Sequence, residues 1–106
     1  GEKDMADTKL NSTEISYFSG QLGMMISSGI SVVESLKLLE GETDSKAGKE
    51  LLSSIVKSLD EGMHLYDAMK ETKAFPDYVL NMVNVGEQTG NLDTVFEALS
   101  EYYEKN

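Results

Sequence analysis

A short segment at positions 86–93, which reads GEQTGNLD, most constrains what this chain can fold into. It lies between two stretches whose apolar residues recur at helical spacing. Gly90 can take a positive φ and end the first helix, and the Asn91 side chain can cap the second by accepting from a free backbone N–H. Asp93 falls in the first turn of that second helix, where the helix dipole favours a negative charge. The segment therefore predicts a tight corner between two helices, and the corner itself has no need of the carboxylate of Glu87.

Apolar spacing and capping residues predict helices along the rest of the chain as well. Asn11 and Glu14 form the pattern of a capping box at the start of the first helix, and Ser31 and Glu34 form another at the start of the second. A third helix carries apolar residues over positions 51–59, a short fourth spans 64–70, and the fifth and sixth flank the corner. The expected helix ends and breaks are Gly29, Gly41 with a polar connection over 41–45, Gly62, and Pro76, which suits the first turn of the fifth helix.

No stretch of the sequence alternates apolar and polar residues in the way that predicts a strand. We therefore predict an all-α fold, a compact bundle of about six antiparallel helices with short loops. The polar residues 1–10 lack any periodicity and are expected to form a flexible N-terminal lead. Residues 11–106 are expected to form one six-helix domain.

Composition excludes several classes of function. The net charge is −10, and the nine basic residues are all lysine, which disfavours binding to nucleic acid. The chain has no cysteine, and no apolar run approaches the ~20 residues of a membrane-spanning helix. His64 is the only histidine, and no phosphate-binding loop, nucleophile elbow or zinc motif is present. We expect neither an enzyme nor a site for a small-molecule substrate.

Three ordered blocks of residues, spanning roughly 15–103, carry a family resemblance. The first is FxxQLxxMIxSGI from Phe18, and the second is LxxGxxLxxAM from Leu59, continuing to Phe75-Pro76. The third and most specific is GExxGNLDxxFxxL from Gly86. In these blocks the chain resembles the type II secretion system protein F family, the inner-membrane platform proteins of type II secretion and type IV pilus machines. His64 stands where that family often has a Ser or Thr as the cap of the short helix.

The resemblance implies the first cytoplasmic domain of such a protein, which precedes its first membrane span and is held at the cytoplasmic face of the bacterial inner membrane by transmembrane helices outside this chain. Such proteins are thought to couple a hexameric assembly ATPase to pilus or pseudopilus assembly, or to type II protein secretion. The implied partners are the assembly ATPase, other inner-membrane components and a second copy of the domain. The resemblance implies no catalytic activity, and no cofactor is expected. It leaves open whether a pilus or a secretion machine is served.

Two sets of residues follow as candidates. Glu87 has no structural task in the corner, and Met24 and Met25 are adjacent, so both cannot face one core. Tyr103 lies near the end of the last helix, where an aromatic pair can anchor at a membrane interface. The candidate contacts for a partner or a second copy are Glu87, Asn91, Asp93, Met24 and Tyr103. The candidate structural positions are Gly29, Gly62, Pro76, Gly86, Gly90 and Leu92.

Other interpretations stay open at this point. Glu87 can instead cap or pair locally near a helix end. Glu87, Asn91 and Asp93 all offer oxygen ligands, so a structural calcium ion near Glu87 is a further alternative, although two or three oxygens do not make a site. The alternative functions are a free-standing soluble helical adaptor and a regulatory helical module that binds a divalent cation.

Overall fold

The computed structural model describes residues 9–106, and over that range the chain forms six α-helices and no strand. This confirms the expected all-α bundle. The helices are α2 (Ser12–Ser27), α3 (Val32–Glu42), α4 (Lys46–Asp60), α5 (Leu65–Thr72), α6 (Asp77–Thr89) and α7 (Leu92–Lys105). Residues 1–8 of the expected flexible lead lie outside the described range. Within the lead, the Leu10 N–H donates to Ala74 O at 3.0 Å, and the boundary at residue 10 remains a prediction.

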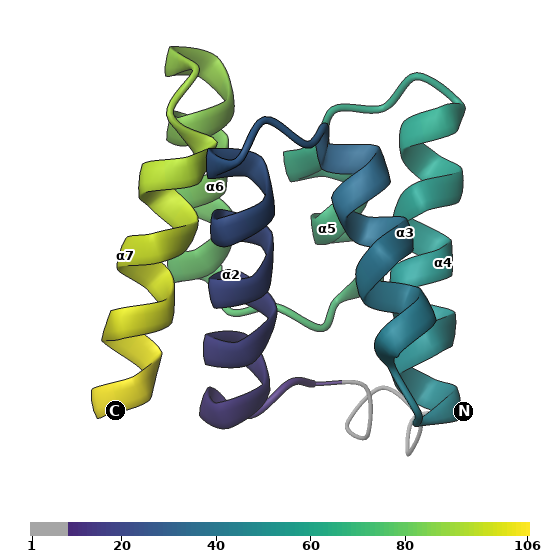
Figure 1. Cartoon of the computed structure of the whole chain (residues 1–106), viewed down its shortest axis with the longest axis horizontal. Helices are drawn as coiled ribbons and strands as arrows, with labels where there is room; N and C mark the ends of the chain where they lie inside the picture. Colours follow the sequence, from purple (N-terminus) through teal and green to yellow (C-terminus); the bar gives the residue numbers. More distant parts are fainter. Residues whose placement is uncertain (1–8) are drawn as a thin grey trace.

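Helices α2 and α7, the first and last of residues 9–106, lie side by side and antiparallel (Figure 1). The Ser16 hydroxyl donates to Ser100 O and the Ser100 hydroxyl donates to Ser16 O, each at 2.9 Å. A Cβ on Gly20 would lie 2.8 Å from Ser100 Oγ, and one on Gly23 would lie 3.1 Å from the Glu97 backbone N. Small residues thus let these two helices approach closely, which joins the two ends of the described chain.

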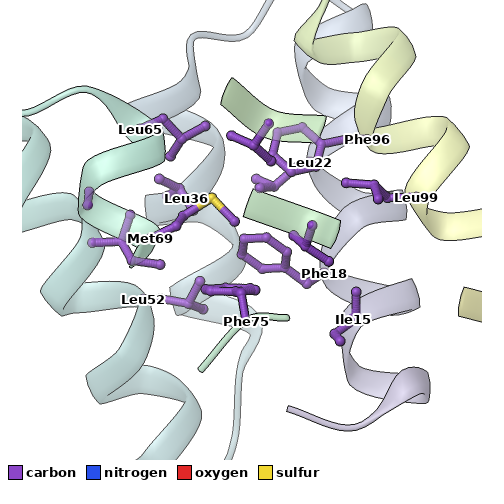
Figure 2. Close-up of a cluster of buried hydrophobic side chains, with 14 of the residues drawn as sticks. Ile15, Phe18, Leu22, Leu36, Leu52, Leu65, Met69, Phe75, Phe96 and Leu99 are labelled. Atoms are coloured by element: carbon purple, nitrogen blue, oxygen red, sulfur yellow. The ribbon is translucent and has the colours of Figure 1, made fainter. Parts of the chain in front are cut away.

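The core lies between this pair and the other four helices, and it is filled by apolar side chains from every helix. Figure 2 shows Phe18 of α2 among side chains from the other elements. Its ring centroid is 5.2 Å from that of Phe75 and 6.0 Å from that of Phe96, the second pair being edge-to-face. Such tilted aromatic pairs stabilise a core beyond the area that they bury.

Several predicted helix boundaries are confirmed. The Asn11 side chain accepts from Glu14 N and the Glu14 side chain accepts from Asn11 N, both at 2.8 Å, which is a complete capping box. Gly29, Gly62 and Gly90 all have positive φ, at 96°, 99° and 73°. These glycines end α2, α4 and α6, because a side chain at a positive φ would clash with its own backbone.

Three expected boundaries were wrong. Gly41 does not end its helix: α3 continues to Glu42, and only positions 43–45 connect it to α4. An isolated glycine is tolerated inside a helix at a modest cost. The short helix α5 begins at Leu65 and ends at Thr72 instead of spanning 64–70. Pro76 is the N-cap of α6 and precedes its first turn, with an extended ψ of 156°.

Candidate functional site

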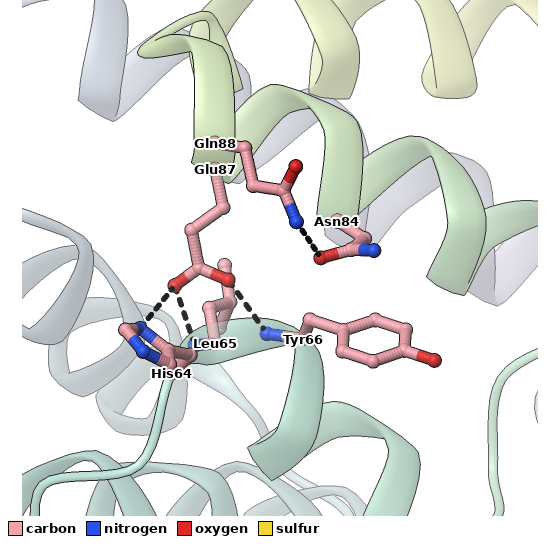
Figure 3. Close-up of polar contacts among 6 residues, drawn as sticks. All are labelled: His64, Leu65, Tyr66, Asn84, Glu87 and Gln88. Carbon is pink, nitrogen blue, oxygen red and sulfur yellow. Dashed lines mark hydrogen bonds and ion pairs between the residues drawn. The ribbon is translucent and has the colours of Figure 1, made fainter.

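The first turn of α5 is capped by a side chain from another helix (Figure 3). Glu87 lies in the last turn of α6, and its Oε2 accepts from the Leu65 N–H at 2.7 Å while its Oε1 accepts from the Tyr66 N–H at 3.0 Å. These two N–H groups have no partner within their own helix, as at every helix start. The carboxylate also meets the positive end of the α5 dipole. Glu87 therefore joins the two helices through both of its oxygens.

His64 occupies the N-cap position of α5 but makes no capping hydrogen bond there. Its side chain is 81% exposed, whereas that of Glu87 is 23% exposed. His64 Nδ1 lies 4.0 Å from Glu87 Oε2, so the pair attract only when the imidazole is protonated. A Ser or Thr at this position would supply a local acceptor. Here the acceptors come from Glu87, which lies 22 residues from Leu65 and 21 from Tyr66 along the chain.

Gly86, the residue before Glu87, lets α6 lie close against α7. Gly86 is buried, and a Cβ there would lie 2.7 Å from Val95 Cγ2 and 3.3 Å from Leu92 Cδ2. A side chain at this position would push the two helices apart. The expected structural role of Gly86 and Leu92 therefore has a physical basis in this contact.

The Asn91 side chain does not cap α7, contrary to expectation. It makes no capping hydrogen bond, and its Nδ2 donates back to Thr89 Oγ1 at 3.0 Å. The backbone of Asn91, with φ −122° and ψ 34°, departs from the extended conformation that places a capping side chain over the first turn. The Asn91 N–H donates to Gly86 O at 2.8 Å, which closes the end of α6. Asp93 lies in the first turn as expected, and its Oδ1 accepts from Thr94 N at 2.8 Å.

The other two contact candidates lie on separate parts of the surface. Met24 on α2 is 55% exposed while Met25 is buried, as their adjacency requires. Tyr103 is partly buried, near the end of α7 opposite the corner. Its ring stacks edge-on against Tyr102 at 5.0 Å, and Tyr102 lies 4.9 Å from Tyr78 of α6. The structure therefore brings Glu87, Asn91 and Asp93 together at the corner, with Tyr103 at the far end, and their role as contacts stays a prediction.

A hollow at the corner is bordered by both Glu87 and Asp93, together with Ile26, Gly86, Gly90 and Leu92. Both oxygens of Glu87 already accept backbone N–H groups, and one oxygen of Asp93 does the same. Across residues 9–106 no group of three or more His, Cys, Asp or Glu side chains is arranged to hold a metal ion. The calcium ion considered from the sequence stays a prediction.

The cross-helix cap was not predicted from the sequence, although one signal pointed to it. A carboxylate in the last turn of a helix is disfavoured by the dipole of its own helix, and α6 has no basic residue in that turn. Glu87 is therefore costly unless something positive lies nearby, and the start of α5 supplies it. The sequence alone indicates that Glu87 is unfavourable for its own helix. It does not indicate which helix N-terminus lies close enough to stabilise the carboxylate.

Comparisons of the sequence with known proteins identify the family to which the chain belongs. The family described as type II secretion system (T2SS), protein F, matches residues 18–106. The chain is 29% identical to the type IV pilus assembly protein PilC of Thermus thermophilus over 87% of its length, and 28% identical to PilC of Myxococcus xanthus over 90%. It is 29% identical to the type II secretion system protein F of Aeromonas hydrophila over 76% of its length.

The aligned part is 23% of each PilC protein and 21% of the Aeromonas protein, so the chain spans about a quarter of the length of the curated relatives it matches. Within residues 9–106 no helix is both long and apolar enough to cross a membrane. The match runs through α2 to α7 and includes the glycine corner and Glu87. The chain belongs to the type II secretion system protein F family.

Proposed function

We propose that this chain is the cytoplasmic domain of an inner-membrane platform protein, held at the cytoplasmic face of the membrane by helices outside the chain. In this role it couples an assembly ATPase to pilus or pseudopilus assembly, or to type II secretion, through protein–protein contacts. The observation that carries the proposal is the family match over residues 18–106, with relatives named for both machines. The proposed partners are the ATPase, other inner-membrane components and a second copy.

The described residues support a recognition role better than a catalytic one. Glu87, the motif carboxylate, has both oxygens committed to backbone N–H groups and is not free to act as a base. His64 lies 4.0 Å from this same carboxylate, and no Ser, Thr or Cys lines the hollow that the two residues share. By contrast, exposed apolar side chains lie on several helix faces, among them Met24 on α2 and Leu38 on α3. We infer a domain that works by contact and has no catalytic activity.

The test is made in the full-length parent protein. Deletion of this domain should abolish co-purification of the assembly ATPase with the membrane platform and should abolish pili or secretion, while the amount of parent protein in the membrane fraction stays unchanged. Unaffected ATPase recovery and unaffected assembly would contradict the proposal. A single substitution, Met24→Glu, tests one exposed face of α2 and should reduce recovery of the ATPase. Val85→Glu is the matched control, because the two side chains are 55% and 57% exposed, and it should leave that recovery unchanged.

A further inference from the structure

A groove at the end of the bundle opposite the glycine corner has an apolar floor. It lies between the start of α2 and the connection from α3 to α4, which Figure 1 shows at the same end of the molecule. The hollow measures about 440 Å³, and an adjoining hollow measures about 430 Å³. The two share five lining residues: Leu10, Glu14, Ser45, Gly48 and Leu51. The floor of the first hollow is formed by Leu10, Phe18, Leu39, Leu51 and Leu52.

The rim of the first hollow is acidic. Glu14, Glu42 and Asp44 line it, and no lysine of residues 9–106 does so; Lys9 lines only the adjoining hollow. Oε1 of Glu14 accepts from Asn11 N within the capping box. Within the described part of the chain, Glu42 and Asp44 make no ion pair. The rim thus presents negative charge beside apolar surface.

The charge at the end of α3 is unfavourable for the helix itself. Glu40 and Glu42 lie in its last turn, which has no basic residue of its own, and one lysine of α4, Lys49, donates from Nζ to Glu40 O at 3.0 Å. A negative side chain there opposes the helix dipole. Lys49 is one positive charge beside two carboxylates, so a further positive group from outside would relieve the remaining repulsion, whereas an anionic surface would increase it. The position of these carboxylates therefore favours a cationic ligand over a nucleic acid or an anionic membrane.

We propose that this groove binds a partner segment that carries apolar side chains next to lysine or arginine, such as a basic amphipathic helix. The apolar side chains of the segment lie on the Leu39 and Leu51 floor, and its positive groups meet Glu42 and Asp44. This recognition mode, an amphipathic segment in an apolar groove, is common among peptide-binding domains. The proposal deepens the proposed function, on which it rests, by giving the surface and the chemistry of one partner.

The probe is a synthetic leucine–lysine peptide of about 14 residues, or four helical turns, with one apolar face. Backbone amide shifts of the full chain are followed by NMR during titration. We expect saturable shifts centred on Tyr17, Leu39, Thr43, Gly48 and Leu51. The same peptide with glutamate in place of lysine should cause no shift.

Two double variants separate groove binding from general charge attraction. Glu42→Gln with Asp44→Asn should raise the Kd about fivefold to tenfold, as expected for the loss of two exposed charge pairs. Asp60→Asn with Glu61→Gln makes the same charge change at the other end of α4 and should change the Kd less than about twofold, since exposed charges beyond a Debye length are screened. Equal weakening by both pairs would overturn the proposal.

Other results would also overturn it. Shifts that map away from the groove would assign the peptide to another surface. Groove shifts that grow with protein concentration alone would assign the groove to a second copy. Groove shifts caused by removing residues 1–8, without any response to peptide, would assign it to the chain's own N-terminal segment. If peptide binding at the groove fails any of these tests while deletion of the domain still abolishes assembly, the peptide-binding proposal is wrong and the proposed function stands.

Discussion

The helices α2 and α5 both begin with backbone N–H groups that their own turns cannot pair, and they obtain acceptors from different distances along the chain. At α2 the acceptor is Asn11, three residues before the N–H of Glu14. At α5 it is Glu87, which belongs to another helix. The first cap depends only on local sequence, whereas the second exists only when α6 packs correctly. The hydrogen bonding at the start of α5 therefore depends on the packing of α6 against it.

The largest expected effect comes from removing the distant cap. Glu87→Ala leaves the Leu65 and Tyr66 N–H groups without an acceptor in a partly buried place. Hydrogen bonds to charged groups contribute about 1.5–3 kcal/mol each. Because the two bonds share one carboxylate that is 23% exposed, their contributions do not add in full, and we expect the free energy of unfolding to fall by about 2–4 kcal/mol. Urea denaturation measures this loss.

The neighbouring residue provides the control for that experiment. Gln88 is exposed, and its amide bonds only to Asn84 of the same helix, at 3.1 Å. Gln88→Ala should change the free energy of unfolding by less than about 0.5 kcal/mol. Equal effects of the two substitutions would show that Glu87 has no special place in the fold.

Two glycines inside helices extend the contrast between local and distant contacts. Gly86→Ala would place a Cβ 2.7 Å from Val95 Cγ2, and overpacking should outweigh the gain in helix propensity, for a net loss of about 1–2 kcal/mol. Gly41 has nothing within 4 Å of a Cβ, so Gly41→Ala should stabilise the chain by about 0.5–1 kcal/mol. Thermal unfolding of both variants checks the opposite signs, and a shared sign would contradict the packing argument.

Replacing the distant cap by a local one sharpens the comparison further. His64→Ser puts a capping hydroxyl at the N-cap of α5. In the Glu87→Ala background it should recover about 1 kcal/mol of the lost stability. In the unaltered chain it should add less than about 0.5 kcal/mol, because an N-cap hydroxyl reaches the second or third N–H of a helix and Glu87 already accepts from the second, that of Tyr66. A double-mutant cycle measures the difference, and equal gains in both backgrounds would rule out a shared site.

The smallest effect is expected at the far end of α7. Burial raises the pKa of the Tyr103 hydroxyl above its ordinary value of 10.0, and the nearby Tyr102 and Tyr78 raise it further. Because the folded-state pKa is the higher one, the contribution of Tyr103 is fully present below pH 10.0 and is lost as the pH rises through the raised pKa. Unfolding measured from pH 9 upward should show this decline, and Tyr103→Phe should reduce its slope. An identical slope in both proteins would contradict the expectation.

Local sequence predicted the parts of this fold that depend on local contacts. The capping box at Asn11 and the positive φ of Gly29, Gly62 and Gly90 follow from residues within a few positions of each other. Gly41 was wrongly predicted to end its helix, because a glycine is common just after a helix end and is also tolerated inside a helix, and the sequence does not distinguish the two cases. The cap of α5 could not be predicted because its donor and acceptor are brought together only by the packing of α6.

The candidate site shows the same division. The glycine corner was predicted in position and in the conformation of Gly90, but the role of the Asn91 side chain was wrong, since it bonds back to Thr89. Glu87 was singled out as the residue without a task in its own corner, and its observed task lies in a neighbouring helix. Substitutions of Glu87 that impair assembly therefore need a stability measurement before they are assigned to a partner contact.

Amide hydrogen exchange at Leu65 and Tyr66 tests the distant cap most directly. In the unaltered chain both amides should be protected, although they are the first two of a helix and would otherwise exchange freely. In Glu87→Ala both should exchange at least about tenfold faster, the factor that corresponds to 1.4 kcal/mol, while the Glu14 amide, capped by Asn11, keeps its rate. Fast exchange of Leu65 and Tyr66 in the unaltered chain, or rates that do not respond to the loss of Glu87, would contradict the account.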